Sequence, residues 1–580
     1  MAGYNETIIS RRRLGVLSAG SIVVIVGIAL RLVQLQVLDH HHYLALARAS
    51  QSHKYDVLPQ RGEIYAMDDG QMSPLVLNQT LDTLYADPKY INNKTLVAGK
   101  LAAAAGGSSA DYMKLLSKNS DYVVLATKLP DNLSSKVKAL NLAGIGLQAE
   151  NYRLYPEGSL ASQLLGFVNA SGQGQYGLEG YFNTKLAGKP GLLDATTDVN
   201  GIPIATANNY LRPPVNGDSY VLTIDRNIQA QVEKYLAAGV QAVGAPSGSA
   251  VVMDPNTGAI LAMANYPTYD PSNYNAVTDY SVFANSVVSN AFEPGSGFKT
   301  FTMAAGLDSG KVTPNTTYND TGTYVVDGYT VKNSENRAYG SENMDDVIQR
   351  SLNTGVMFVL RMMGTSADVI TLPGKQLLYN YLTGHFDFGI KTGIEQAGES
   401  PGHVNPPTSS DVNYANMTFG QGLDVTMIQM VQGYAAVANG GTLYKPYLVG
   451  KVMHSNGSST TTKPTVLKSH IISTQTASEL TTMLEGVVDR GTGEATKIPG
   501  YEIAGKTGTA QVARPDGQGY DPTDNIGSFT GYGPAGDPKF VMMVRINNPK
   551  TPGFAESTTV PVFGQITSWL LRYLEVPPNQ

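Results

Sequence analysis

The sequence contains no cysteine among its 580 residues. That absence excludes disulfide bonds, cysteine-based zinc sites and thiol catalysis. Charge is also scarce, at 15% of residues, and a formal net charge of -6 provides no basic stripe for a phosphate backbone. We therefore expect no nucleic-acid partner. The eight histidines form no helical pair with glutamate of the kind that binds zinc, so we expect no metal and no cofactor.

Apolar residues are abundant, at 42% of the chain, which is enough material for several packed cores. The 61 glycines and 31 prolines are spread along the sequence and do not gather in one tract. Such spacing is typical of turns in α/β or α+β domains. Two or more domains are expected.

An uncharged, strongly apolar run lies near the N-terminus, where Arg11-Arg12-Arg13 precedes the stretch Leu14–Leu30. The run has the length of a membrane-spanning helix, and arginines favour the cytoplasmic side. A cleaved signal peptide is the alternative, because Ala45-Leu46-Ala47 resembles a cleavage site, but the apolar run is too long for one. We expect a cytoplasmic tail at 1–13, a retained single-pass plasma-membrane anchor at 14–38 and an extracytoplasmic remainder.

The character of the sequence changes near residue 216. Residues 39–215 are polar and carry no catalytic pattern, whereas residues 216–580 show alternating strands, an amphipathic helix and a hairpin turned at Asn256-Thr257-Gly258. This order of elements predicts an α+β domain built on a mostly antiparallel sheet flanked by helices. The predicted elements are strands at 217–225, 501–513, 527–534 and 539–546, a hairpin at 247–265, and helices at 227–243 and 561–574.

Ser296 and Lys299 are the first candidate catalytic residues. Pro294 and Gly295 favour a helix start, and the apolar spacing that follows places Ser296 in the first turn. Lys299 then lies on the same face, within reach of the serine oxygen. A lysine whose pKa is lowered by burial or by a nearby cation can take the serine proton. Taken alone, Ser-x-x-Lys also describes a plain helix cap, and it recurs at Ser135-Lys136-Val137-Lys138.

The second candidate is Ser351-Leu352-Asn353, in a helical pattern that follows Asp345 and Asp346. A serine and an asparagine at this spacing can provide a proton relay and a side-chain amide in one cleft. Two rivals, Ser334-Glu335-Asn336 and Ser341-Glu342-Asn343, lie in the polar loop before it. We favour Ser351 because a helix would hold it, and loops position catalytic groups less well.

The third candidate is Lys506-Thr507-Gly508-Thr509, inside the strand predicted at 501–513. Small residues let a strand approach a substrate closely, and Lys506 supplies a positive charge for a carboxylate. The segment 500–507 also fits a phosphate-binding loop, which requires a strand before it and a helix after it. A loop precedes this segment and a polar turn follows, so nucleotide binding is disfavoured.

Two further patterns share one segment. Lys391-Thr392-Gly393 repeats the lysine motif, and 398–402 fits the G-x-S-x-G elbow with His403 beside it. An elbow needs a helix after the serine, which the prolines at 401, 406 and 407 prevent. We interpret the segment as a structural loop and expect no Ser-His-Asp triad.

The three motifs in order match the set found in penicillin-recognising serine enzymes, and the triple is much more specific than any one of them. The flanking sequence resembles the class B penicillin-binding proteins, which are monofunctional cell-wall D,D-transpeptidases, and is more similar to the septal than to the elongation type. The resemblance covers nearly the whole chain and implies a pedestal domain of the dimerisation type at 39–215 and a transpeptidase domain at 216–580. Besides the motifs, it includes Arg61-Gly62-Glu63-Ile64 and the stretches at 153–169, 177–191 and 419–426.

The resemblance also implies roles for individual residues. Ser296 would attack the penultimate D-alanine carbonyl of a stem peptide, release terminal D-alanine and pass the acyl group to an amine on a neighbouring stem. Lys299 would act as the base, Ser351 would relay the proton and Asn353 would orient the substrate amide. The residues that would hold the substrate carboxylate and the oxyanion are Lys506, Thr507, Gly508 and Thr509, with the amide of Ser296.

Two other classes carry the same motifs: a hydrolase, either a D,D-carboxypeptidase or a β-lactamase, and a non-catalytic β-lactam sensor or scaffold. A β-lactamase is usually compact and lacks an anchor and pedestal, and a sensor would carry a signalling domain, for which the segment before Arg11 is short.

The partners implied are stem peptides ending in D-Ala-D-Ala and β-lactams, which would form a stable acyl-enzyme. A membrane glycosyltransferase of the shape, elongation, division and sporulation family and division proteins are also implied.

Overall fold

The chain folds into two compact units, one of Met1–Gln60 with Gly188–Asn216 and one of Arg61–Ala187 with Gly217–Gln580. The computed structural model describes residues 3–196, 210–334, 337–513, 519–550 and 554–578.

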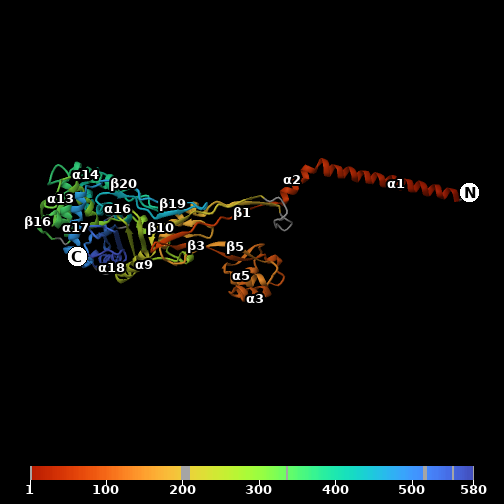
Figure 1. Ribbon diagram of the computed structural model, residues 1–580, viewed down its shortest axis with the longest axis horizontal. Helices are drawn as coiled ribbons and strands as arrows, with labels where there is room; N and C mark the ends of the chain where they lie inside the picture. Colours follow the sequence, from red (N-terminus) through yellow and green to blue (C-terminus); the bar gives the residue numbers. More distant parts are fainter. Residues whose placement is uncertain (1–2, 197–209, 335–336, 514–518, 551–553, 579–580) are drawn as a thin grey trace. The chain divides into compact units, whose positions relative to one another are not determined.

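The first unit contains a long N-terminal helix and a small sheet (Figure 1). Helix α1, Gly3–Val33, continues as a π-helical segment at Gln34–Leu38, so the chain stays helical past Arg31, as predicted. Among the described residues, Arg11–Leu38 is the one helical stretch long and apolar enough to cross a membrane. The remaining elements are helix α2, His40–Gln51, and the antiparallel strands β1, Ser52–Val57, β8, Gly191–Thr196, and β9, Tyr210–Arg212.

A five-stranded antiparallel sheet forms the centre of the second unit, in the order β12-β11-β23-β22-β21. Its side chains alternate between two cores: Val251 and Met253 face one, and Ala250 and Val252 face the other. The predicted hairpin and the last three predicted strands are confirmed here. The strands are β11, Ser247–Met253, β12, Ile260–Tyr266, β21, Ala504–Ala513, β22, Tyr520–Gly533, and β23, Phe540–Asn547.

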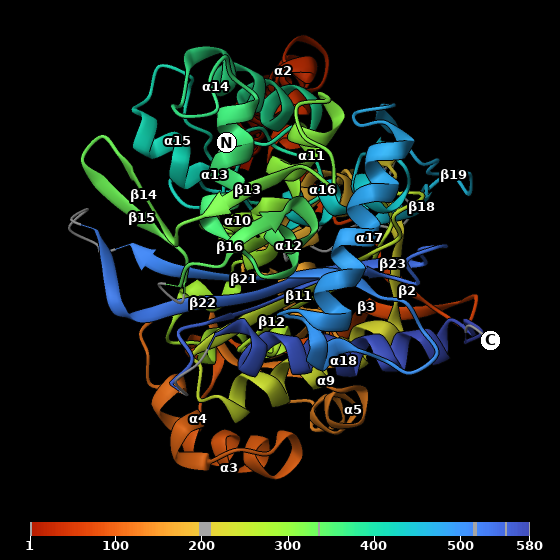
Figure 2. The same cartoon turned by 90° about the vertical axis from the view of Figure 1, so that its left-hand side faces the viewer.

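Helices cover both faces of this sheet, as predicted (Figure 2). Helices α9, Arg226–Ala242, and α18, Ala555–Tyr573, pack on one face, and α11, Lys299–Asp308, and α16, Met427–Ala438, lie on the other. The helix predicted to start at Pro561 starts six residues earlier. Proline favours the first turn of a helix, but here it sits inside α18.

A second sheet runs in the order β19-β18-β10-β2-β3-β4, with β5 also paired to β3. Strands β10 and β2 pair in parallel and the other pairs are antiparallel. The strands are β2, Ile64–Asp68, β3, Gln71–Ala86, β4, Val123–Leu129, β5, Ile145–Leu154, β10, Ser219–Asp225, β18, Val449–Met453, and β19, Ser459–Thr461. Beside β3 to β5 lie α3, Lys94–Ala105, α4, Ser109–Leu116, and α5, Asp131–Ala139.

The other elements are short and connect these layers. The helices are α6, Ser162–Leu165, α7, Gly177–Tyr181, α8, Asn183–Ala187, α10, Ser286–Ser289, α12, Met344–Gln349, α13, Asn353–Met362, α14, Leu372–Tyr379, α15, Asp411–Met417, and the longer α17, Thr474–Arg490. Two-stranded pairs join β6, Phe167–Val168, to β7, Gly174–Gln175; β13, Thr317–Asp320, to β16, Gly340–Asn343; β14, Thr323–Val326, to β15, Tyr329–Lys332; and β17, Leu443–Tyr444, to β20, Val466–Lys468.

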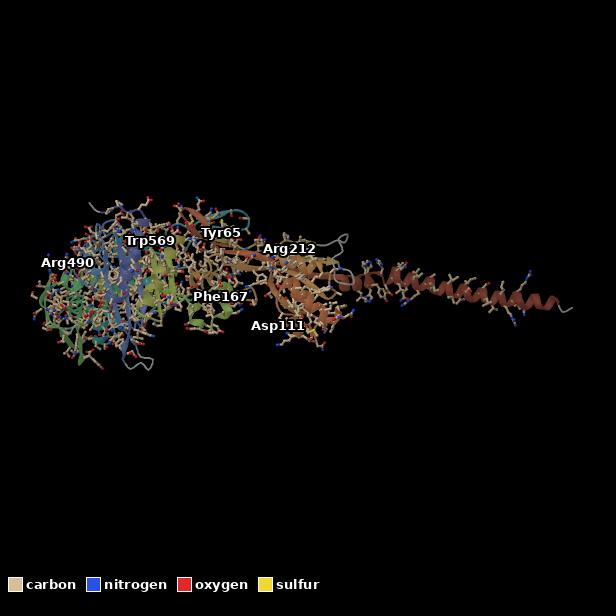
Figure 3. The ribbon with its side chains drawn as sticks, turned by 90° about the horizontal axis from the view of Figure 1, so that it is seen from below. Tyr65, Asp111, Phe167, Arg212, Arg490 and Trp569 are labelled. Carbon is tan, nitrogen blue, oxygen red and sulfur yellow. The ribbon has the colours of Figure 1, made fainter. Side chains whose placement is uncertain are left out.

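Aromatic packing joins residues on either side of position 216. Phe167, labelled in Figure 3, stacks on Tyr274 with ring centroids 4.3 Å apart and contacts Phe283 at 4.9 Å. Tyr269 completes the cluster, and its hydroxyl donates to the carbonyl of Ser162 at 3.0 Å. These contacts fix the segment after α6 against the loop that leads to the candidate nucleophile.

A buried ion cluster joins three of the sequence stretches that carried the family resemblance. Glu179, from the stretch at 177–191, is fully buried and pairs with Arg153 at 2.6 Å and with Arg61 through two guanidinium nitrogens. Arg61 also donates to the side chain of Asn183 at 3.0 Å. Removing one member of such a cluster leaves opposite charges buried without compensation.

We therefore predict that Glu179→Ala lowers the free energy of unfolding by about 3–5 kcal/mol, because Arg61 and Arg153 lose their counter-charge. Thermal and urea unfolding of the purified full chain measure this loss. Glu494→Ala, which removes an exposed carboxylate, is the control and should change stability by less than about 0.5 kcal/mol. Equal effects of the two substitutions would contradict the prediction.

Candidate active site

Ser296 lies in a 3-10 turn, Gly295–Phe298, that leads directly into α11. The sequence placed it in the first turn of a helix, and the structure confirms a helical start there, tighter than an α-helix. Phe298 and Phe301 are fully buried, with ring centroids 5.3 Å apart, and both pack on Phe388. This aromatic cluster holds the turn in place, while the Ser296 side chain is only partly covered.

Strand β21 passes very close to this turn, and two glycines make the approach possible. A Cβ on Gly508 would lie 2.7 Å from the carbonyl oxygen of Pro294 and 2.4 Å from the Ser528 hydroxyl. Gly295 has a φ of +58°, and a Cβ there would lie 2.5 Å from the carbonyl oxygen of Thr509. The backbone around Ser296 therefore lies beside the backbone of Thr509.

Two lysines are fully buried at this site. Lys299 donates through Nζ to the carbonyl oxygen of Ser351 at 2.5 Å and to its hydroxyl at 3.1 Å. Burial, together with the positive charge of Lys506, lowers the pKa of Lys299 well below its usual value. Burial also lowers the pKa of Lys506, to about 8, and its Nζ donates to the Thr507 hydroxyl at 3.1 Å. The structure thus brings Lys299, Ser351 and Lys506 together.

Ser351 is not held by a helix, so that part of the prediction is wrong. It occupies the turn between α12 and α13 with a left-handed φ of +60°. The helical pattern on both sides is real, but the chain reverses at this residue, and the sharp turn directs its oxygens toward Lys299. Of the rivals, Ser341 lies in β16, whose last residue, Asn343, caps α12. Residues 335 and 336 of the other rival lie outside the described residues.

Asn353 begins α13, and its side-chain amide donates to the carbonyl oxygen of Lys332 at 2.7 Å. Behind it lies a buried polar network that the sequence did not reveal. Thr354 donates to Asp320 at 2.6 Å, and Asn333 donates to both oxygens of the same carboxylate. This network anchors the start of α13 to β13 and β15. The one signal for it in the sequence was the pair Asn353-Thr354 directly after Ser351-Leu352.

The threonines of the lysine motif have different partners. Thr507 shares a hydrogen bond of 2.7 Å with the hydroxyl of Thr492, a residue in the loop before β21 that sequence reasoning missed. The hydroxyl of Thr509 accepts a hydrogen bond from the amide of Ala555 at the start of α18, at 3.3 Å. Both contacts orient strand β21, which ends the strand order of the five-stranded sheet, relative to its neighbours.

The sequence patterns set aside earlier are structural. Thr392 donates to Glu399 through its amide and hydroxyl, at 2.7 and 2.6 Å. These hydrogen bonds close the loop that begins with Lys391-Thr392-Gly393. His403 forms an isolated bridge with Asp424 in irregular chain, and Ser135 lies on α5. Residues 500–507 enter strand β21, whereas a phosphate-binding loop leads into a helix. Across the ranges that the structure describes, no three histidine, aspartate or glutamate side chains converge as a metal site would.

Comparison with known proteins identifies both regions of the chain. The family model of the penicillin binding protein transpeptidase domain matches residues 248–568. The family model of the penicillin-binding protein dimerisation domain matches residues 56–222. Stage V sporulation protein D of Bacillus subtilis is 33% identical over 99% of this chain and 87% of its own length. Peptidoglycan D,D-transpeptidase FtsI of Escherichia coli is 30% identical over 87% of this chain and 83% of its own.

Solved structures show the same fold. Penicillin binding protein 3 of Mycobacterium tuberculosis, complexed with aztreonam, superposes with a TM-score of 0.69 at 26% identity and covers 91% of this chain and 98% of that one. Penicillin Binding Protein 2X of Streptococcus thermophilus gives a TM-score of 0.74 at 24% identity, covering 90% of this chain and 80% of that one.

The two lysines generate a prediction about pH. If neutral Lys299 is the base, acylation by a penicillin requires its deprotonation, and the rate rises with pH through the lowered pKa of Lys299. Lys506→Met removes the neighbouring positive charge, so the pKa of Lys299 rises and the profile moves to higher pH. The maximal rate should also fall about 10- to 100-fold, since a charge-assisted hydrogen bond to the ligand carboxylate is lost.

Lys506→Arg is the matched variant, because it keeps the positive charge and should leave the profile near its original position. The measurement is the second-order rate of covalent labelling by a fluorescent penicillin between about pH 5 and 9. A Lys506→Met profile that loses amplitude but does not move would show that Lys506 has no electrostatic influence on the base.

Proposed function

The chain belongs to the class B penicillin-binding proteins and is a serine D-Ala-D-Ala transpeptidase, and we propose that Ser296 is the residue it acylates. The observation that carries this assignment is the burial of Lys299 against both oxygens of Ser351, one helical turn from Ser296. A neutral lysine amine has two N–H groups for those oxygens and one lone pair left for the serine proton. Burial and the charge of Lys506 favour that neutral form.

The first half-reaction then follows from these groups. Lys299 takes the hydroxyl proton of Ser296 while the Ser296 oxygen attacks the carbonyl of the penultimate D-alanine. The amides of Ser296 and Thr509 stabilise the oxyanion, a role supported by the close approach of the turn to β21. Ser351 passes the proton to the nitrogen of the terminal D-alanine, which leaves, and Ser296 holds the acyl group as an ester.

The second half-reaction uses the same groups in reverse. An amine of a neighbouring stem peptide attacks the ester, gives up its proton through Ser351 to Lys299, and Ser296 is released with its proton restored. Asn353 orients the substrate amide. Lys506, with Thr507 and Thr509, binds the substrate carboxylate, since its pKa of about 8 leaves it mostly protonated at neutral pH. Gly508 keeps this strand within reach of the Ser296 turn.

A β-lactam reacts with such a site because its amide imitates the D-Ala-D-Ala end, and its ring-opened acyl group remains attached to Ser296. The alternatives with the same motifs, a hydrolase or a sensor, would also be acylated. The transpeptidase is favoured by the match of both family models and by relatives named as peptidoglycan D,D-transpeptidases.

The anchor, the domains and the partners complete the proposal. We place the tail 1–13 in the cytoplasm, the anchor at 14–38, a pedestal at 39–215 and the transpeptidase domain at 216–580 outside the membrane. The triple arginine before an apolar helix supports this orientation. We propose a septal role beside a membrane glycosyltransferase of the shape, elongation, division and sporulation family and division proteins, supported by the similarity to FtsI of Escherichia coli.

The assignment of Ser296 predicts that Ser296→Ala abolishes covalent labelling of the membrane-bound full chain by a fluorescent penicillin. Ser135→Ala removes the serine of the other Ser-x-x-Lys, on α5, and should label at the wild-type rate. Thermal unfolding checks that both variants are folded. Label retained by Ser296→Ala would refute the assignment. A membrane-impermeant penicillin applied to spheroplasts tests the orientation, because only an outward-facing domain would be labelled.

The septal role predicts the shape of cells that are depleted of this protein in their native host. Blocked septation with continued side-wall growth should give filaments at least several cell lengths long, and a plasmid copy carrying Ser296→Ala should not restore division. Phase-contrast microscopy measures this. Rounded or widened cells that still divide would assign the protein to elongation.

A further inference from the structure

A cavity of about 630 Å³ lies in the same compact unit as the candidate active site, where α7 and α8 face strands β10 and β18. None of its lining residues belongs to the elements that carry Ser296, Ser351 or Lys506. Its size is that of a site for a small organic ligand. The candidate mechanism makes no use of it.

One wall of this cavity is aromatic. The rings of Phe182 and Tyr220 stack with centroids 4.4 Å apart, and Tyr181 packs edge-on to Phe182 at 4.8 Å. Tyr181 remains 48% exposed at the opening, whereas Tyr220 is almost completely buried. Within the described part of the chain the Tyr220 hydroxyl has no hydrogen-bond partner, and burial keeps its pKa above the usual value, so it stays protonated as a donor.

The charged groups in the wall are unevenly engaged. Asp218 pairs with His454 at 3.2 Å, and Glu395 accepts a hydrogen bond from the amide of Leu448 at 2.8 Å. The ammonium groups of Lys185 and Lys445 make no salt bridge or hydrogen bond to any residue that the structure describes. Burial raises the pKa of Glu395, and the nearby charge of Lys445 offsets part of that rise. The cavity therefore offers two cations beside two carboxylates, each of which has one protein partner.

We propose that this cavity binds a carboxylate-bearing glycan–peptide segment of peptidoglycan, a proposal that rests on the function above. A sugar ring has one face of C–H groups, which suits the exposed ring of Tyr181, and a rim of oxygens that accept hydrogen bonds. The carboxylate of an attached stem peptide complements Lys185 and Lys445. The strand whose stem peptide enters the active site extends beyond it, so a second contact would hold the polymer on the enzyme.

The test uses the full chain in detergent, with Ser296 acylated by a penicillin so that stem peptides cannot enter the active site. The probe is a purified uncrosslinked disaccharide–pentapeptide, titrated by calorimetry. We expect saturable binding that weakens about tenfold or more in Lys185→Gln/Lys445→Gln, since two charge-assisted contacts are lost. Lys136→Gln/Lys138→Gln, which removes two exposed lysines of α5, should bind as wild type does.

Two further probes identify the chemistry. The pentapeptide without sugars and chitotetraose without a carboxylate should each bind at least about tenfold more weakly than the complete fragment. Absence of saturable binding, equal affinity in the double lysine variant, or equal affinity for either partial probe would overturn the proposal. Covalent penicillin labelling of the same samples reports on Ser296 separately. The titration is repeated with Ser296→Ala. Failure of the nucleophile assignment would appear in the labelling, whereas failure of this site would appear in the titration.

Discussion

Two lysine side chains, Lys299 and Lys506, occupy a space from which water is excluded, and the rest of the site depends on that constraint. Two ammonium groups in a low-dielectric environment repel each other and each lacks hydration, so the neutral form of one of them is favoured. The two lysines donate to different partners. Lys299 donates to Ser351 in the turn before α13, and Lys506 donates to Thr507 in strand β21. Burial lowers the pKa of Lys299, as its proposed role of base requires, and Lys506 is left as the charge proposed to bind the substrate carboxylate.

Maintaining this arrangement requires close contact between segments far apart in sequence. Gly295 and Gly508 let the turn that carries Ser296 and strand β21 approach to distances that no side chain would allow. Aromatic rings behind Ser296 and the polar network of Asp320 keep both sides of the cleft fixed. The ion cluster around Glu179 performs a similar task away from the cleft, where it joins three segments of the chain.

Local signals in the sequence were sufficient for much of this structure. The alternation in the sheet strands and the helical spacing after Ser296 depend on neighbours a few residues away, so the sheet and the helical start at Ser296 could be predicted. Ser351 could not be placed correctly, because helical periodicity on both sides conceals a single left-handed residue. Thr492 and Asp320 become visible only when distant segments meet, and the same is true of the cavity beside Tyr220.

Among the residues that the structure describes, strand β21 is the last strand of its sheet, so one of its edges has no neighbouring strand there. Backbone groups at such an edge can pair with any extended chain, whatever its side chains. A site organised around an edge recognises the course of a peptide backbone, and only the terminal carboxylate demands a specific charge. With β21 in the substrate-binding role proposed above, a stem peptide with altered side chains would meet the same backbone groups. The same tolerance leaves the enzyme open to any small rigid molecule that presents an amide and a carboxylate at the right separation.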